Sequence, residues 1–174
     1  AFMPLPSDSA HKVAHFSFDD VYDVLLDITE HEPVYASAFD NPFLGSLKRL
    51  HELYEAKFVL YVYDTYPEVA FDIADVSVKY QSEFMANSGW LKFGYHTIEP
   101  TTSFDKETSL AAFKTSFSKV KDAIGRFAGE ACFSNVLRLN YFRGDDDKVA
   151  FLASQGITAL LCADDDRASY NLPE

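Results

Sequence analysis

The chain has 174 residues, 48% of them hydrophobic and 16% aromatic, which is enough for one globular domain with a substantial core. Its formal net charge is −12. A field of that sign repels nucleic acid and anionic membranes, so we exclude nucleic acid as a partner. No apolar run approaches the roughly 20 residues that span a bilayer, so no membrane span is expected. Sugars, metal ions and other neutral or cationic small molecules remain as ligands.

The chain divides into a lead-in segment, residues 1–11, and one α/β domain, residues 12–174. The lead-in carries two prolines and no periodicity. It has no basic start followed by an apolar stretch, so we expect no signal peptide in it. Secretion and a cytoplasmic location both stay open, as does the oligomeric state. Cys132 and Cys162 are too few for a disulfide framework and are expected to be buried thiols.

Five short runs have the length of strands and are rich in Val, Leu, Tyr and Phe. They are residues 13–18, 58–63, 91–96, 136–142 and 158–163.

Four stretches between these runs have apolar residues at helical spacing. The first begins after Asn41, a capping residue followed by proline. The second is expected over residues 72–84, with aspartate as its cap, and the third over residues 110–127. The fourth, residues 145–156, starts in an aspartate run and stops at a glycine. Because strands alternate with helices, crossover connections make consecutive strands parallel, with the helices outside.

Parallel α/β folds bind their ligands at the carboxyl ends of the strands. Each predicted strand end supplies a charged or titratable group. In chain order these groups are Asp19 and Asp20; Asp64; His96 and Glu99; Arg138 and Arg143; and Asp164, Asp165, Asp166 and Arg167. Aspartate is also common in turns and at helix starts. We prefer that structural explanation for residues 145–147, since a helix dipole favours negative charge there. For Asp64 both explanations stay open.

Asp19 and Asp20 are adjacent carboxylates directly after an apolar strand, and they repel one another unless a cation or hydrogen bonds compensate. Together with His96 they have the chemistry of a site for a divalent metal, zinc first among the candidates. One aspartate would bind the metal and the other would act as base. No GxSxG, HExxH or glycine-rich phosphate motif occurs, and Cys132 has no recognisable catalytic context.

The tetrapeptide Ser17-Phe18-Asp19-Asp20 resembles the first motif of polysaccharide deacetylases (carbohydrate esterase family four), usually written TFDD. The resemblance implies that Asp19 is the catalytic base and Asp20 a metal ligand. The sequence FGYHT resembles the second motif, H-S/T-x-x-H, at its first histidine, which implies that His96 is a metal ligand. Pro100 stands where that motif has its second histidine.

The segment RLNYFRG, residues 138–144, is similar in placement to the family's arginine motif, although the proline of that motif is absent. The resemblance implies that Arg138 orients the base. With the second histidine missing, Asp20 and His96 are two ligands, and three is the usual number of protein ligands at a catalytic zinc. Further ligands or substrate contacts are expected among four residues: Asp64, Glu99, Asp164 and Asp166.

The likeness runs from about Lys12 to Tyr170 and includes HFSFDDV and GITALLCADDDRASY. It is a likeness to a divergent bacterial branch of the superfamily. It implies a parallel (β/α) barrel, partial or distorted, with five strands visible. The family has about seven strands and a late leucine-x-histidine motif that supplies a catalytic acid. We therefore expect that the chain lacks a C-terminal part and is nearly inactive alone.

The leading functional hypothesis is a metal-dependent hydrolase that removes acetyl groups from a carbohydrate. One alternative is a non-catalytic carbohydrate-binding protein with a degenerate site, in which an exposed Trp90 and tyrosines supply stacking faces. A second alternative is a glycoside hydrolase, for which the adjacent Asp19 and Asp20 are a poor match to opposed acid and base.

Overall fold

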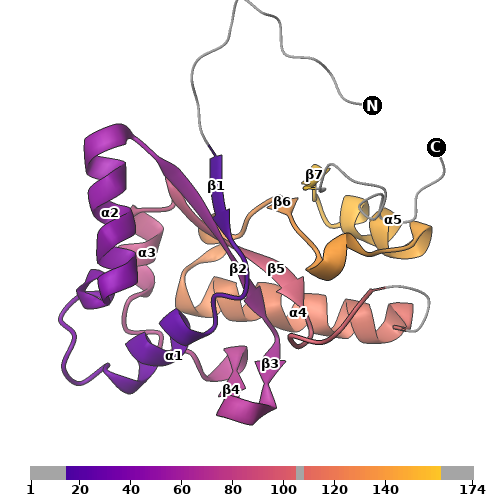
Figure 1. Cartoon of the computed structure of the whole chain (residues 1–174), viewed down its shortest axis with the longest axis horizontal. Coiled ribbons are helices and arrows are strands. Elements are labelled where there is room, and N and C mark those ends of the chain that lie inside the picture. Colours follow the sequence, from indigo (N-terminus) through magenta and orange to yellow (C-terminus); the bar gives the residue numbers. More distant parts are fainter. Residues whose placement is uncertain (1–14, 105–107, 162–174) are drawn as a thin grey trace, which may run out of the picture.

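The computed structural model describes residues 15–104 and 108–161 (Figure 1). Its centre is a parallel sheet in the order β1-β2-β5. The strands are β1 (His15–Phe18), β2 (Lys57–Tyr63) and β5 (Leu91–Thr97). Nearly every residue of β2 and β5 is buried, as expected for strands covered on both faces.

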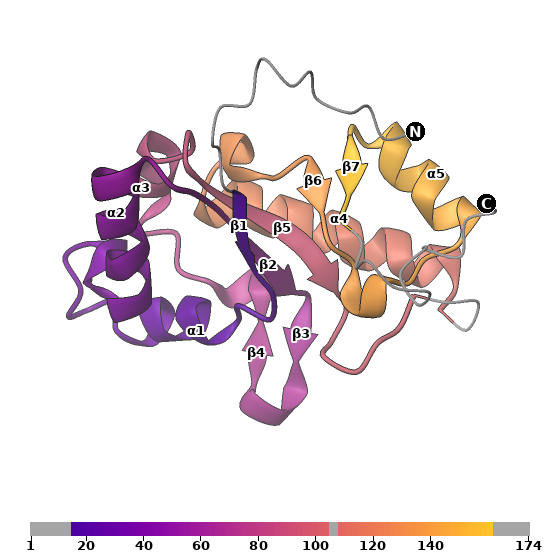
Figure 2. The same ribbon diagram turned by 45° about the horizontal axis from the view of Figure 1, so that its top comes forward.

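Two short parallel strands, β6 (Val136–Leu137) and β7 (Ala159–Leu160), pair with each other beside β5 (Figure 2). The backbone N–H of Ser134 donates to the carbonyl of Phe93 at 2.7 Å, within a parallel bridge that links β5 to the segment before β6. The described strands do not close into a barrel. The fold is therefore mixed α/β with parallel strands, as the alternation of strands and helices predicts.

Five α-helices accompany the strands in the described parts of the chain. They are α1 (Asp23–Glu30), α2 (Pro42–Tyr54), α3 (Gln81–Ala86), α4 (Leu110–Phe127) and α5 (Asp146–Ser154). Three of the four predicted helices are confirmed as α2, α4 and α5. The cap predicted for α2 is also confirmed, because Asn41 Oδ1 accepts from the N–H groups of Phe43 and Leu44, both at 3.0 Å.

Helix α4 runs along β5 and supplies much of the core (Figures 1 and 2). Its apolar stripe is buried as predicted: Phe113, Phe117, Val120, Ile124 and Phe127. Among the described residues, no helix has the length and hydrophobicity needed to cross a bilayer.

The single helix predicted over residues 72–84 is wrong. Asp72 caps only a 3₁₀ turn, Ile73–Asp75, by accepting from Ala74 N–H at 2.8 Å. The chain leaves helical geometry at Val76, whose ψ is 132°, and the next residue, Ser77, donates its N–H to Thr29 and accepts from Lys79 N–H at its hydroxyl. These side-chain contacts take the backbone groups that a continuous helix needs.

The strand predicted over residues 136–142 is also too long, because β6 ends at Leu137. Beyond it the chain turns through a 3₁₀ segment, in which Tyr141 and Phe142 adopt left-handed backbone angles. Asn140 holds this turn by donating to the carbonyls of Pro100 and Thr102, at 3.0 and 2.9 Å. Arg138 therefore lies just after its strand, at the start of a strained loop.

Two elements have no counterpart in the prediction. Helix α1 follows β1 after only four residues, and a small antiparallel hairpin, β3 (Thr65–Tyr66) with β4 (Phe71–Asp72), extends from the end of β2. Figure 2 shows this hairpin projecting past the ends of the parallel strands. It borders the edge where the predicted site residues lie.

Candidate active site

The carboxyl ends of the parallel strands bring together residues from three of the predicted motifs. Arg138, after β6, donates from Nη1 to Oδ2 of Asp19, after β1, at 3.0 Å. His96, near the end of β5, has its Nε2 atom 3.4 Å from Oδ1 of Asp20. The structure thus places Asp19, Asp20, His96 and Arg138 together at the carboxyl ends of the strands, although they span about two thirds of the chain.

Asp20 occupies a strained backbone position. Its φ of 62° lies in the left-handed region, which costs a residue with a Cβ roughly 1–2 kcal/mol. The turn is held by Val21 N–H, which donates to the Tyr61 carbonyl at 3.0 Å, and by Tyr22 N–H, which donates to the Asp20 carbonyl at 2.9 Å. Strained positions of this kind are common at functional sites, although aspartate tolerates the left-handed region better than most residues.

A β-bulge presents His96. In the pairing of β2 with β5, Val62 opposes Tyr95 and Tyr63 opposes Thr97, so that His96 is an extra residue without a partner in this pairing. Bulges re-aim side chains beside active sites. The His96 side chain is almost fully buried, at 4% exposed, while the Asp20 side chain is 59% exposed. The buried His96 ring therefore approaches the exposed Asp20 carboxylate at the protein surface.

The protonation pattern of His96 follows from its other contact. Its Nδ1 atom lies 2.6 Å from the carbonyl oxygen of Arg138. A carbonyl oxygen can only accept, so Nδ1 carries a proton and donates it. In the neutral ring, Nε2 then holds a lone pair that faces Asp20. This is the arrangement in which histidine binds metal ions, with a backbone carbonyl fixing the tautomer.

Two tyrosines of β2 support the histidine ring. The ring centroids of Tyr61 and Tyr63 lie 6.2 and 6.3 Å from that of His96. Gly94 makes room for Tyr61, because a Cβ at that position would come within 2.8 Å of the Tyr61 ring. The Tyr61 hydroxyl donates to the carbonyl of Val136 at 3.0 Å, which ties the ring to β6.

Both tyrosines remain hydrogen-bond donors over the whole physiological range. Burial raises the pKa of Tyr61 far above its ordinary value, and the charge of Asp19 adds to this while Arg138 opposes it. Burial also raises the pKa of Tyr63, and the interaction of its hydroxyl with the Asp20 carboxylate raises it further. Neither tyrosine is among the site residues predicted from the sequence, yet the alternation along a strand places them on one face, two positions apart, at its carboxyl end.

The two oxygens of Asp19 have different surroundings. Oδ2 accepts from Arg138, whereas Oδ1 is buried and has no hydrogen-bond partner among the described residues. The Arg138 guanidinium is in turn held near the Phe142 ring, with Cζ 5.9 Å from the ring centroid. An unpartnered buried carboxylate oxygen is costly, so its presence indicates a group that a ligand or water normally satisfies.

Of the further predicted ligands, the described ones, Asp64 and Glu99, form no metal-binding group with Asp20 and His96. Asp64 is buried at the end of β2, but its Oδ1 atom pairs with Lys119 Nζ of α4 at 2.7 Å. Glu99 lies in the half-buried loop after β5. In the described parts of the chain no group of three His, Cys, Asp or Glu side chains is arranged to hold a metal. Asp164 and Asp166 lie outside the described residues.

The stacking surface expected at Trp90 is wrong. Trp90 is only 6% exposed, and its ring stacks on that of His51 at a centroid distance of 4.6 Å and an angle of 6°. Its Nε1–H donates to Asn87 at 2.9 Å. Cys132 is buried as expected, and burial raises the pKa of its thiol to about 11. Cys162 lies outside the described residues.

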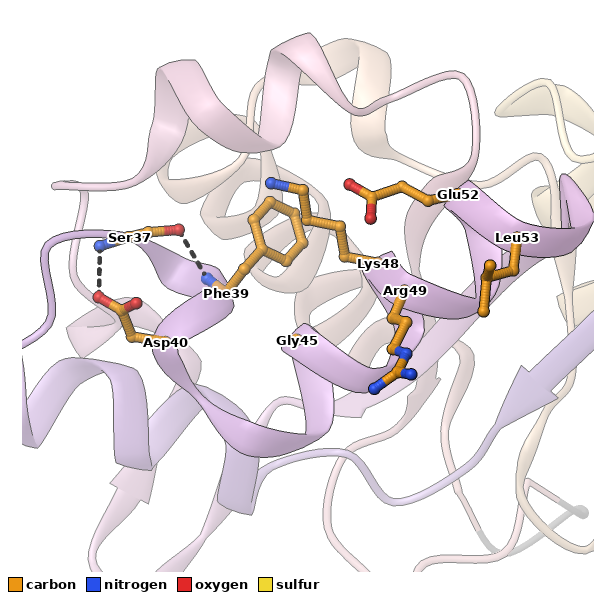
Figure 3. A pocket seen from close by; sticks show the side chains of 8 residues that line it. All are labelled: Ser37, Phe39, Asp40, Gly45, Lys48, Arg49, Glu52 and Leu53. Carbon is orange, nitrogen blue, oxygen red and sulfur yellow. Dashed lines mark hydrogen bonds between the residues drawn. The ribbon is translucent and has the colours of Figure 1, made fainter.

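A groove of about 580 Å³ lies elsewhere, along α2 and the 3₁₀ turn before it (Figure 3). Lys48 extends over the Phe39 ring, with Nζ 4.9 Å from the centroid, and Arg49 and Glu52 lie further along the same helix. The groove contains none of the predicted site residues. Its charges are mixed in sign, so it favours no particular ligand.

Comparisons with protein-family models, with curated proteins and with solved structures find no match for this chain.

Proposed function

We propose that the protein is a metal-dependent hydrolase that removes acetyl groups from a carbohydrate. The observation that carries the proposal is that two adjacent carboxylates have different partners. Asp19 pairs with a cation, Arg138, while Asp20 faces the available nitrogen of His96. The resemblance of the first motif to that of polysaccharide deacetylases predicts this same division.

A divalent ion fits the donor set of Asp20 and His96. Two ligands of a tetrahedral zinc ion, each about 2.1 Å from the metal, are separated by roughly 3.4 Å. The separation of Nε2 and Oδ1 is 3.4 Å. That distance is long for a hydrogen bond between these atoms, and suits two ligands that share an ion. Asp20 and His96 would hold the ion, and among the described residues no third side chain of a ligand type joins them.

The residues of the chain would then have separate roles in the reaction. A bound divalent ion supplies a water of lowered pKa and polarises the acetyl carbonyl. Asp19 would accept the proton of the attacking water at Oδ1, the oxygen that has no partner among the described residues, and would return it to the sugar oxygen or nitrogen as its bond to the acetyl carbon breaks. Arg138 holds the opposite oxygen, Oδ2, and so keeps Oδ1 directed at the water.

We also propose that the sheet is one arc of an incomplete (β/α) barrel. The parallel bridge at Phe93 and the bond from Tyr61 to Val136 place β6 next to β5. The strands would then follow one another as β1-β2-β5-β6-β7, all parallel. The site lies at their carboxyl ends, where barrel enzymes have their active sites.

The test is acetate release from acetylated chito-oligosaccharides and acetylated xylan with Zn²⁺ added. We expect slow turnover by the chain alone, and a further loss of about 100-fold or more in Asp19→Asn, which removes the base. Asp19→Asn should keep its zinc in calorimetry, whereas His96→Ala should lose it. Asp122→Asn, an exposed carboxylate of α4, is the matched control and should retain activity.

Assays of the same samples also distinguish the two alternative functions, a carbohydrate-binding protein and a glycoside hydrolase. Oligosaccharide binding without acetate release would replace the proposal by a carbohydrate-binding protein. New reducing ends without acetate would replace it by a glycoside hydrolase. Equal zinc affinity in the wild type, Asp19→Asn and His96→Ala would refute the assignment of ligand and base.

A further inference from the structure

Three tyrosines form a compact cluster beside the candidate active site. Tyr63 ends β2, Tyr22 immediately precedes α1, and Tyr66 belongs to β3 of the hairpin. The ring centroid of Tyr22 lies 5.7 Å from that of Tyr63 and 4.9 Å from that of Tyr66. The centroids of Tyr63 and Tyr66 are 6.2 Å apart. We call these three residues the tyrosine cluster.

The tyrosine cluster leads from the site toward solvent. Tyr63 is buried, with its ring centroid 6.3 Å from that of His96, whereas Tyr22 and Tyr66 are each partly exposed. A second step of 6.2 Å leads from Tyr63 to Tyr66. Tyr66 lies on the hairpin that projects past the ends of the parallel strands (Figure 2). A ligand of more than one ring that reaches His96 therefore has the Tyr66 ring within its reach.

The hairpin that carries Tyr66 is fixed at its base. The N–H of Ile73, just after β4, donates to the carbonyl of Asp64 at 3.0 Å. Lys119 Nζ of α4 pairs with Asp64 Oδ1 at 2.7 Å and with Asp72 Oδ2 at 2.9 Å. These contacts tie both ends of the hairpin to the helix. The Tyr66 ring is therefore held near the site before a ligand binds, which lowers the entropic cost of binding.

The surroundings of Tyr66 indicate the charge of the ligand. The Tyr66 hydroxyl donates to Glu68 Oε2 at 3.2 Å, and the exposed Asp20 carboxylate lies two residues before Tyr22. Aromatic rings pack on the apolar face of a sugar ring, and carboxylates accept hydrogen bonds from its hydroxyl groups. The same carboxylates, in a chain of net charge −12, repel an anionic ligand. This combination suits a neutral sugar and disfavours a uronic acid.

We propose that the tyrosine cluster is a binding subsite for a neutral oligosaccharide, in which the sugar unit next to the one at His96 packs on Tyr66. The inference deepens the proposed function, on which its choice of a carbohydrate rests. It makes an oligosaccharide, rather than a single sugar, the preferred ligand. It also moves the aromatic contact expected at Trp90 to the hairpin.

Three substitutions separate an aromatic contact from a loss of packing. Tyr66→Leu keeps an apolar side chain against Tyr22 but removes the flat ring. Tyr66→Phe keeps the ring and removes only the hydroxyl that reaches Glu68. Tyr54→Leu is the matched control, because Tyr54 is 73% exposed at the end of α2, next to the amino end of β2 and thus away from the site.

Calorimetry with N-acetylated chitotetraose in EDTA measures binding under conditions in which no metal-dependent turnover occurs. We expect Tyr66→Leu to weaken binding by about 3- to 10-fold, and Tyr66→Phe and Tyr54→Leu to stay within about 2-fold of the wild type. The wild type should bind tetragalacturonate more weakly by about 10-fold or more.

Three results would overturn the inference. The first is equal affinity for chitotetraose in Tyr66→Leu and the wild type, and the second is a loss in Tyr66→Phe as large as that in Tyr66→Leu. The third is a wild type that binds no chitotetraose, or that binds tetragalacturonate as tightly.

Acetate release with added Zn²⁺ separates this inference from the proposed function. Chitotetraose binding that depends on Tyr66, without acetate release, would defeat the hydrolase and leave the subsite standing. Acetate release with the same KM in the wild type and Tyr66→Leu would defeat the subsite and leave the hydrolase standing. Where both are correct, Tyr66→Leu raises KM more than it lowers kcat, because the contact is made before and during the reaction alike.

Discussion

Arg138 and Asp19 form an ion pair at 3.0 Å across 119 positions of sequence. Each side chain is a little under one third exposed, so water screens the pair only in part. The pair joins the loop after β6 to the loop after β1. It therefore sets the distance between two motifs that are remote in sequence.

Arg138→Met should destabilise the fold by about 1–2 kcal/mol, because it leaves both oxygens of Asp19 without a partner among the described residues. In the Asp19→Asn background, the destabilisation caused by Arg138→Met should be smaller by about 0.5–1 kcal/mol, because the negative charge of Asp19 is absent. Urea unfolding of the four proteins measures this coupling. Full additivity would mean that solvent screens the pair completely. Arg126→Met, which removes an arginine bound to the Ala74 carbonyl, controls for general loss of a cation.

Asp20 offers a separate test of strain at the site. Asp20→Gly should be more stable than Asp20→Ala by about 1–2 kcal/mol, because glycine has no Cβ to oppose a φ of 62°. Both substitutions remove the carboxylate, so both should lose zinc and activity. Thermal unfolding in EDTA compares them without interference from metal. If alanine proved as stable as glycine, the left-handed turn would not be a feature of the protein in solution.

The sequence predicted the parallel arrangement and the strand ends at which Asp19, Asp20 and His96 lie. These depend on local patterns, a short apolar run followed by polar residues, which are visible in one dimension. The break after Asp72 was not predictable in this way, because Ser77 takes its partner from Thr29, 48 positions away. Tertiary contacts outweighed an apolar stripe that fits a helix.

The details of the site depend on contacts of the same long-range kind. The bulge at His96 appears only when β5 is paired with β2, since neither strand alone specifies its register. The partner of Asp64 on α4 is likewise a product of packing. The motif resemblance nonetheless implies that Arg138 orients the base, Asp19. In the structure the Arg138 guanidinium donates to the Asp19 carboxylate. The roles of these residues in catalysis remain predictions.

Gly94 should be intolerant of substitution because of its neighbour across the sheet. A Cβ there would lie 2.8 Å from two atoms of the Tyr61 ring and 3.0 Å from Leu137. Gly94→Ala should therefore cost about 1–3 kcal/mol, the usual range for overpacking, and should push Tyr61 out of contact with His96. Gly89→Ala is the control, since nothing lies within 4 Å of its added Cβ. We expect Gly89→Ala to be neutral or slightly stabilising. Equal unfolding midpoints for the two variants would contradict the close packing of Gly94.

Asp145 makes the fold sensitive to acid. It caps α5 by accepting from Lys148 N–H at 3.0 Å, and its other oxygen pairs with Lys148 Nζ at 2.5 Å. Burial opposes ionisation of the carboxyl, but these contacts outweigh burial and hold the pKa of Asp145 below its usual 3.8. A carboxyl with a lower pKa in the folded state binds protons more tightly when unfolded. Its contribution to stability is therefore complete above about pH 4 and is lost as the pH falls through the folded-state pKa.

Asp145→Asn keeps the capping oxygen and removes the charge, so it isolates this electrostatic contribution. At pH 7 we expect the variant to be less stable than the wild type by about 0.5–1.5 kcal/mol. The two proteins should converge as the pH is lowered from 4 toward 2, because the wild-type carboxyl is then protonated. Urea unfolding at a series of pH values measures the difference. Asp122→Asn changes the net charge equally at an exposed site of α4 and should show no such convergence. A difference for Asp145→Asn that stays constant down to pH 2 would show that the charge of Asp145 contributes nothing and that only its capping geometry matters.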